Sequence, residues 1–128
     1  GGTNTKFGVV DRDGNVLTQG SISSKTHDDS FDAFFQDMAL AIRKSLQEVG
    51  PTHLLGIGVG AANGNYYHGT IEHATNLPWK GIIPLADMVR KEFDVPCIVT
   101  NDANAAAVGE MVFGAAKGMK DFIVITLG

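Results

Sequence analysis

Apolar residues recur along the chain with two different periods, and the changes between them predict where helices and strands lie. The clearest helical period runs from residue 31 to residue 49, with apolar side chains three or four positions apart at Phe31, Phe34, Phe35, Met38, Ile42, Leu46 and Val49. Gly50 and Pro51 follow and commonly end helices. The pattern therefore predicts a helix over residues 31–49.

The first part of the chain has shorter apolar runs, at residues 6–10 and 16–22. The polar residues 11–15 separate them and contain an Asp13-Gly14 step, which favours a tight turn between antiparallel strands. The chain is therefore expected to open with a β-hairpin.

Strands and helices are expected to alternate after residue 50. The predicted strands are 54–60, expected to be buried on both faces, then 95–99 and 121–127; the predicted helices are 84–93 and 102–113. Residues 61–71 suggest a loop with a small hairpin turning at His68-Gly69, and residues 75–79 suggest irregular structure. This order predicts an α/β fold with parallel strands after an antiparallel start, in one domain spanning residues 1–128.

Composition limits the class of protein. The 128 residues carry a net charge of −4, which argues against a nucleic-acid partner. The sequence has no secretion signal and no apolar run of the roughly 20 residues that a membrane span needs. Its single cysteine, Cys97, lies in an apolar run and is expected to be buried and reduced. We therefore expect a cytoplasmic protein without membrane contact.

The main candidate for catalysis is Asn101-Asp102, between an apolar run and an alanine-rich stretch. This is the carboxyl end of a predicted strand, where open α/β sheets bind ligands. Asn or Asp there could simply cap the following helix. The Asp102 carboxylate could also accept a proton from a substrate hydroxyl during phosphoryl transfer. Both roles remain open, and they are compatible.

A second candidate is the opening segment, residues 1–6. Its two glycines let the backbone approach an anion closely, while Thr3, Asn4 and Lys6 add polar groups and a positive charge. The alternative is an ordinary polar turn. The segment lacks the Gly-Lys-Ser/Thr ending of a Walker phosphate loop.

Other conspicuous residues are assigned structural roles. The four histidines lack metal-ligand spacing, so no metal site is predicted among them. Packing is favoured over sugar stacking for Trp79, Tyr66 and Tyr67. The small residues Ala105, Ala106 and Gly109 predict close packing of their helix on a neighbour, and Glu110 is expected to be solvated or to act as a cap.

Three segments together resemble the ROK family (repressors, open reading frames and sugar kinases), nearest to its bacterial glucokinase-like members. Residues 1–11 are similar to the first phosphate motif, residues 75–79 to the Asn-Leu-Pro-Gly-Trp-type segment, and residues 101–110 to the catalytic motif. Their order and spacing also agree with the family.

The resemblance implies an actin-like, ribonuclease-H-like ATPase fold with a mixed sheet and flanking helices. It implies phosphorylation of a hexose by ATP with Mg²⁺, with glucose the first choice and glucose 6-phosphate the product. Asp102 would be the general base. Sugar contacts would come from Asn101, Asn76, Ala62, Asn63 and Gly64, and ATP phosphate contacts from Gly2, Thr3, Asn4 and Lys6.

The resemblance covers about the N-terminal half of a full kinase. The family's first strand with its Asp would precede residue 1, and its second phosphate motif, further sugar ligands and possible zinc site would follow residue 128. The 128-residue segment is thus expected to be inactive alone, within a homodimeric or larger parent. N-acetylmannosamine, N-acetylglucosamine, fructose and allose are alternative substrates. The alternative function is the sugar-sensing lobe of a ROK repressor, which the retained Asp102 disfavours.

Overall fold

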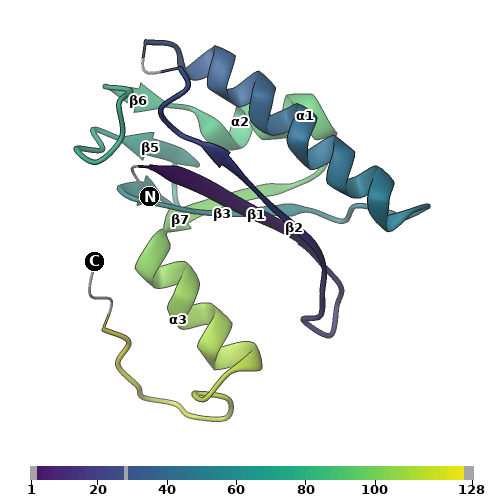
Figure 1. The fold of residues 1–128 in the computed structure, drawn as a ribbon. Helices are drawn as coiled ribbons and strands as arrows, with labels where there is room; N and C mark the ends of the chain where they lie inside the picture. Colours follow the sequence, from purple (N-terminus) through teal and green to yellow (C-terminus); the bar gives the residue numbers. More distant parts are fainter. Residues whose placement is uncertain (1–2, 28, 126–128) are drawn as a thin grey trace. The chain divides into compact units, whose positions relative to one another are not determined.

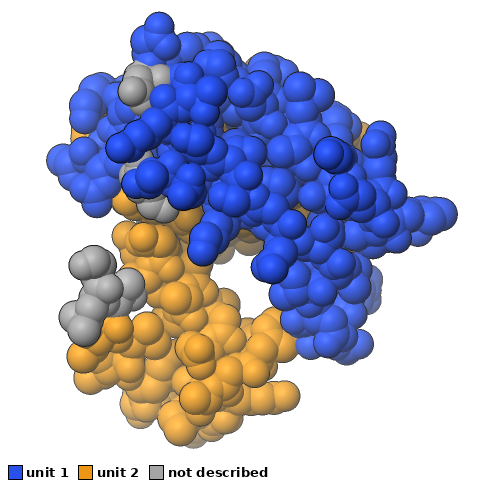
Figure 2. Space-filling model, in the orientation of Figure 1, with its two compact units in different colours: residues 1–54, 74–80 blue, residues 55–73, 81–128 orange. Residues whose placement is uncertain are grey.

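A computed structural model describes residues 3–27 and 29–125 (Figure 1). The chain divides into two compact units, coloured separately in Figure 2. The first unit comprises Gly1–Leu54 and Ala74–Lys80, and the second comprises Leu55–His73 and Gly81–Gly128.

The first unit opens with the predicted β-hairpin. Strands β1 (Asn4–Val10) and β2 (Val16–Ser23) pair antiparallel, with a shift in register between Val9 and Val10. The Asp11 carboxylate closes the turn by accepting hydrogen bonds from the backbone N–H groups of Asp13 and Asn15 and from the Asn15 amide, each at 2.9 Å. These bonds, led by that from the Asn15 side chain, lower the pKa of Asp11.

Helix α1 (Phe31–Val49) has the predicted bounds and packs on both strands of the hairpin. Ser30 caps its N-terminus, where the Ser30 hydroxyl accepts a hydrogen bond from the Ala33 N–H at 3.2 Å. The face towards the hairpin buries Phe34, Phe35 and Ala39. The helical period read from the sequence is therefore confirmed, and it marks the core of this unit.

Trp79 anchors the segment Ala74–Lys80 within the same unit. Its ring is 7% exposed, and its centroid lies 4.5 Å from that of Phe34 and 5.1 Å from that of Phe31. The indole N–H donates to the His27 carbonyl at 2.7 Å. The interpretation of Trp79 as a packing residue is confirmed, as is the irregular structure of residues 75–79.

The second unit is built around two parallel strands, β3 (Ile57–Ala61) and β7 (Cys97–Asn101), with Ile57 opposite Cys97 and Ala61 opposite Asn101. Helix α2 (Leu85–Phe93) packs on β7, and helix α3 (Asp102–Phe113) contacts both strands. Three short strands, β4 (Gly64–Asn65), β5 (Thr70–Glu72) and β6 (Ile82–Ile83), form an antiparallel sheet. The hairpin turning at His68-Gly69 is thus confirmed, and β6 is a strand too short to leave a pattern in the sequence.

Cys97 and Val99 of β7 form the core of this unit with Leu85 and Val89 of α2. Cys97 is a free thiol, 3% exposed, as expected. Burial raises the pKa of the Cys97 thiol, and the charge of Arg90 opposes this shift in part. The thiol is therefore a core group and not an activated nucleophile.

Three expectations are wrong in detail. Strand β3 is not buried on both faces, because Gly58 and Gly60 are exposed and β7 is its one partner in the described part of the chain. The strand predicted over residues 121–127 is absent from residues 121–125, where Ile123 is 87% exposed. An apolar pattern forms a strand only where a neighbouring strand is available to pair with it. Residues 126–127 lie outside the described residues.

The third correction concerns α3. Ala105 does lie close to β3, since a Cβ added at Gly60 would come within 3.0 Å of the Ala105 Cβ. Ala106 and Gly109 are exposed, however, and the helix buries none of its residues, because no described element covers that side. Glu110 is the predicted cap: its carboxylate accepts a hydrogen bond from the Ala115 N–H at 2.8 Å.

None of the helices in the described part of the chain has the length and the apolar character that a membrane span requires.

Candidate functional site

The carboxyl ends of β3 and β7 meet at one edge of the second unit. The two strands run parallel and end at paired residues, Ala61 and Asn101. β3 leads directly into the predicted site residues 62–64, and β7 ends at the predicted residue Asn101, which Asp102 follows. The sheet register thus brings together two groups of residues that lie nearly 40 positions apart in sequence.

Asn101 is the N-cap of α3. Its side-chain oxygen accepts hydrogen bonds from the N–H groups of Ala103 at 2.9 Å and Asn104 at 3.4 Å. The capping role considered for this pair of residues is therefore confirmed and belongs to Asn101. The Asn101 Nδ2 group donates to no residue in the described part of the chain, so it remains available to a ligand.

Asp102 is the first residue of α3, and its side chain is exposed. Its Oδ1 accepts from the Ala103 N–H at 3.0 Å. The Oδ2 atom has no partner among the described residues. The positive end of the helix dipole favours a carboxylate here. The structure thus offers an exposed carboxylate with one oxygen uncommitted; its role as a base stays a prediction.

The loop after β3 lies tightly against the end of β7. Asn63 adopts a left-handed backbone conformation (φ 55°), and its amide donates to the carbonyls of Glu72 at 3.0 Å and His73 at 3.3 Å. Gly64 packs on the Thr100 peptide so closely that an added Cβ would lie 2.6 Å from the Thr100 carbonyl carbon. Only glycine fits at this position without displacing backbone.

Replacing Gly64 by Ala is expected to lower the free energy of unfolding by about 1–3 kcal/mol, because the new methyl group must push the loop away from β7. Chemical denaturation measures this loss. Gly58→Ala is the matched control. Gly58 also belongs to the second unit, but a Cβ added there meets nothing within 4 Å. Equal stability of the two variants would contradict the described contact.

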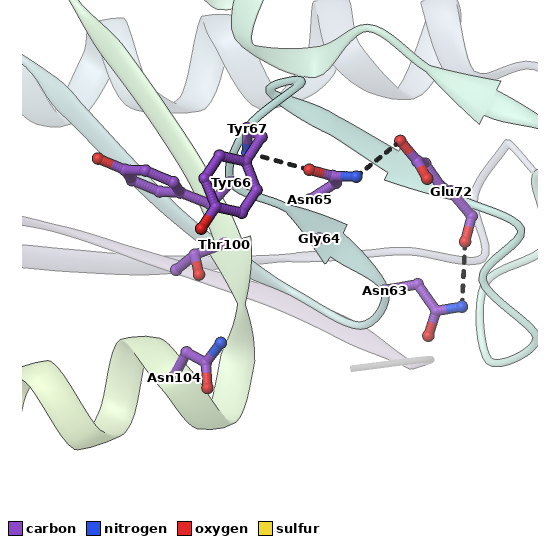
Figure 3. A pocket seen from close by; sticks show the side chains of 8 residues that line it. All are labelled: Asn63, Gly64, Asn65, Tyr66, Tyr67, Glu72, Thr100 and Asn104. Atoms are coloured by element: carbon purple, nitrogen blue, oxygen red, sulfur yellow. Dashed lines mark hydrogen bonds between the residues drawn. The ribbon is translucent and has the colours of Figure 1, made fainter.

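An open pocket of about 490 Å³ lies beside this edge (Figure 3). Its volume is in the range of small-molecule sites. It is lined by Asn63, Gly64, Asn65, Tyr66, Tyr67, Glu72, Thr100 and Asn104. Asn101 and Asp102 do not line the pocket, although Thr100 and Asn104, which lie within two positions of Asp102 in the chain, do. Asn63 and Gly64 were expected at a sugar pocket. Of the other six residues, Tyr66 and Tyr67 were considered for sugar stacking but assigned to packing, and the remaining four were not predicted to line a pocket.

Glu72 organises one side of the pocket. Its Oε1 accepts from the Thr70 hydroxyl at 2.7 Å and the Asn65 amide at 3.1 Å, and it lies 3.1 Å from the His68 Nδ1. These contacts, led by Thr70 and then His68, lower the pKa of Glu72. Glu72 is therefore a carboxylate at neutral pH.

Tyr66 and Tyr67 are 60% and 91% exposed, so the interpretation of both as packing residues is wrong. They lie on the turn between β4 and β5, and no described element covers them. A polar and aromatic cluster at a predicted turn was the signal that could have indicated a binding role.

Ala62, the other residue predicted to contact the sugar, lies in the second unit between β3 and β4 and does not line the pocket. The remaining predicted residues belong to the first unit. Asn4 and Lys6 point to the exposed face of β1, while Thr5 faces the other way and its hydroxyl lies 2.9 Å from that of Ser24. Thr3 and Asn76 are exposed. Gly2 lies outside the described residues. Across residues 3–27 and 29–125, no three His, Cys, Asp or Glu side chains gather into a group that could hold a metal ion.

Comparison with known proteins identifies one family over the whole chain. The model of the ROK family matches residues 1–128. The chain is 37% identical to a glucokinase of Streptomyces coelicolor over 129 residues, covering all of this chain and 38% of that protein. It is also 37% identical over 79 residues to a xylose repressor of Caldicellulosiruptor bescii, covering 61% of this chain and 20% of the repressor. The chain therefore spans less than half the length of these relatives.

Solved structures agree. A ROK family glucokinase from Streptomyces griseus, in complex with glucose and AMPPNP, superposes with a TM-score of 0.70 at 31% identity, covering 92% of this chain and 36% of that one. A ROK hexokinase from Thermus thermophilus gives a TM-score of 0.75 at 26% identity, covering 92% and 38%. These neighbours have an actin-like ATPase fold, which confirms the expected fold class. The chain belongs to the ROK family.

Proposed function

We propose that this chain is part of an ATP-dependent hexose kinase that converts glucose to glucose 6-phosphate, with Asp102 as the general base. The observation that carries the proposal is the exposed Asp102 carboxylate at the carboxyl end of β7, within two positions of Thr100 and Asn104, which line a pocket with amide and hydroxyl groups. The 37% identity to a glucokinase and the likeness to a glucokinase bound to glucose and AMPPNP support it.

The chemistry requires little of the protein beyond positioning and charge. In the proposed reaction the 6-hydroxyl oxygen of the sugar bonds to the γ-phosphorus of ATP as the bond to the leaving ADP oxygen breaks, and the hydroxyl proton passes to Asp102. Oδ2 of Asp102 is free of protein partners in the described structure and can take that proton. The Asn101 Nδ2 group and Asn76 donate to sugar hydroxyls.

The nucleotide phosphates are proposed to contact Gly2, Thr3, Asn4 and Lys6. The exposed face of β1 that carries Asn4 and Lys6 fits this chemistry, because a cation and polar groups stand together on it. Mg²⁺ usually retains water and binds substrate phosphates with one or two carboxylates. A metal ion that arrives with ATP therefore needs no cluster of protein ligands, and when bound it neutralises charge on the phosphates.

The alternative is the sugar-sensing lobe of a ROK repressor. The match to a xylose repressor over 79 residues favours it. A sensor needs the sugar pocket but no base, so an exposed Asp102 at the end of β7 favours the kinase.

The test is a coupled ADP-release assay on the full-length protein with glucose, N-acetylmannosamine, N-acetylglucosamine, fructose and allose. The kinase proposal expects ATP turnover that depends on a hexose, with glucose giving the highest kcat/KM. Sugar binding without turnover would support the repressor instead. The 128-residue chain, assayed in parallel, is expected to show no turnover, since it spans 38% of its glucokinase relative.

A further inference from the structure

Tyr66 and Tyr67 form an exposed aromatic pair at the pocket. Their ring centroids lie 5.6 Å apart and their planes are nearly perpendicular, at 84°. Both rings line the pocket and are drawn in Figure 3 with the other lining residues. No element in the described part of the chain covers these tyrosines, and tyrosine supplies rigid, amphipathic contact area for ligands.

The other lining groups restrict what such a ligand is. The pocket contains three amides, those of Asn63, Asn65 and Asn104, and the hydroxyl of Thr100. None of its described lining residues is lysine or arginine, and Glu72 is ionised. A phosphate or carboxylate would therefore meet repulsion without a compensating cation. Aromatic faces with neutral hydrogen-bonding groups fit an uncharged sugar ring, which has apolar C–H faces and hydroxyl edges.

The turn that carries the tyrosines is held in place before any ligand arrives. Asn65 Oδ1 accepts from the N–H groups of Tyr67 at 3.0 Å and His68 at 3.2 Å. The Asn65 amide also donates to Glu72, and the Gly69 N–H donates to the Asn65 carbonyl at 2.9 Å. A turn fixed in this way loses little conformational entropy when a ligand binds.

We propose that Tyr66 and Tyr67 form a stacking subsite that binds the apolar face of a neutral pyranose in the pocket that Thr100 and Asn104 also line, and that Glu72 excludes anionic sugars from it. The assignment rests on the proposed function, because it identifies the sugar class of that same site. Tyr66 and Tyr67 are the specificity-determining residues, and the Asn65–Glu72 contacts position them.

The test measures glucose binding to the full-length protein without ATP, by isothermal titration calorimetry, for wild type, Tyr66→Ala/Tyr67→Ala and Tyr66→Phe/Tyr67→Phe. The alanine variant is expected to weaken glucose binding about tenfold, and the phenylalanine variant, which keeps both aromatic faces, by less than about threefold. Leu55→Ala, which removes an exposed apolar side chain of the same unit away from the pocket, is the control and is expected to leave the Kd unchanged.

A second arm tests Glu72 with glucuronate. The wild-type protein is expected to bind glucuronate at least about tenfold more weakly than glucose. Glu72→Gln keeps the shape of the side chain but removes its charge, so it is expected to lower the ratio of the glucuronate Kd to the glucose Kd. Thermal unfolding of each variant separates loss of fold from loss of binding.

An unchanged glucose Kd in the folded alanine variant would overturn the stacking subsite, and so would an equal loss in the phenylalanine variant. An unchanged ratio in Glu72→Gln would overturn the exclusion of anions. Because these arms contain no ATP, they are independent of turnover. A protein that binds glucose through the tyrosines but phosphorylates no hexose would refute the kinase function and leave the subsite standing.

Discussion

Asp102→Asn in the full-length protein is expected to lower kcat for glucose phosphorylation by about 10²–10⁴-fold while leaving glucose affinity within about threefold. The amide keeps the shape of the carboxylate but cannot take the proton from the attacking hydroxyl, and general-base catalysis contributes about that much. The fold should tolerate the change, since the side chain is exposed and Asn101, not Asp102, caps α3. Steady-state kinetics and calorimetric binding measure the two quantities.

Asp87→Asn is the matched control for charge at a helix start. Asp87 is also an exposed acidic residue in the first turn of a helix, α2, and it pairs with Arg90 at 2.8 Å. Losing an exposed pair and a helix-dipole contact costs on the order of 1 kcal/mol or less. The kcat of Asp87→Asn should therefore stay at the wild-type value. If kcat in Asp102→Asn also remains within threefold of wild type, Asp102 is not the base.

Trp79→Ala is expected to lower the free energy of unfolding by about 3–5 kcal/mol, the usual loss when a large buried aromatic is removed from a core. The substitution removes the contacts with Phe31 and Phe34 and leaves the His27 carbonyl without its indole donor. It also frees the segment that carries Asn76, so KM for glucose should rise together with the loss of stability. Because Trp79 is the sole tryptophan in the sequence, unfolding must be followed by circular dichroism.

Two further variants separate the parts of this effect. Trp79→Phe keeps a ring against Phe34 but loses the hydrogen bond to the His27 carbonyl. It should therefore lower the free energy of unfolding by less than Trp79→Ala, and about 1–3 kcal/mol of its loss should come from the unpaired carbonyl. Tyr67→Ala removes an aromatic ring that is 91% exposed and should leave the free energy of unfolding nearly unchanged. If Trp79→Ala is as stable as Tyr67→Ala, the described anchoring of Ala74–Lys80 is wrong.

Some residues of the candidate site were predicted from the sequence, but the full set of residues that line the pocket was not. Asn101, Asp102, Asn63 and Gly64 stood out because polar residues follow apolar runs, and parallel pairing of β3 with β7 placed their segments at one edge. The two tyrosines were considered for sugar stacking but assigned to packing, and Glu72 and Asn104 did not stand out. Their role depends on how a short hairpin lies against the end of β7, and no local pattern encodes that position.

The elements that could be predicted from the sequence are those whose formation depends on near neighbours. Helix α1 has its predicted bounds because apolar spacing, the Ser30 cap and Gly50 all act within a few residues, and the Asp11 turn closes the first hairpin in the same way. What each element packs against depends on the tertiary structure. Residues 121–125 have a strand-like pattern yet form no strand, Gly58 and Gly60 are exposed, and Tyr66 and Tyr67 line a pocket. Burial and strand pairing depend on partners distant in the chain, whereas turns, caps and helical periods depend on adjacent residues.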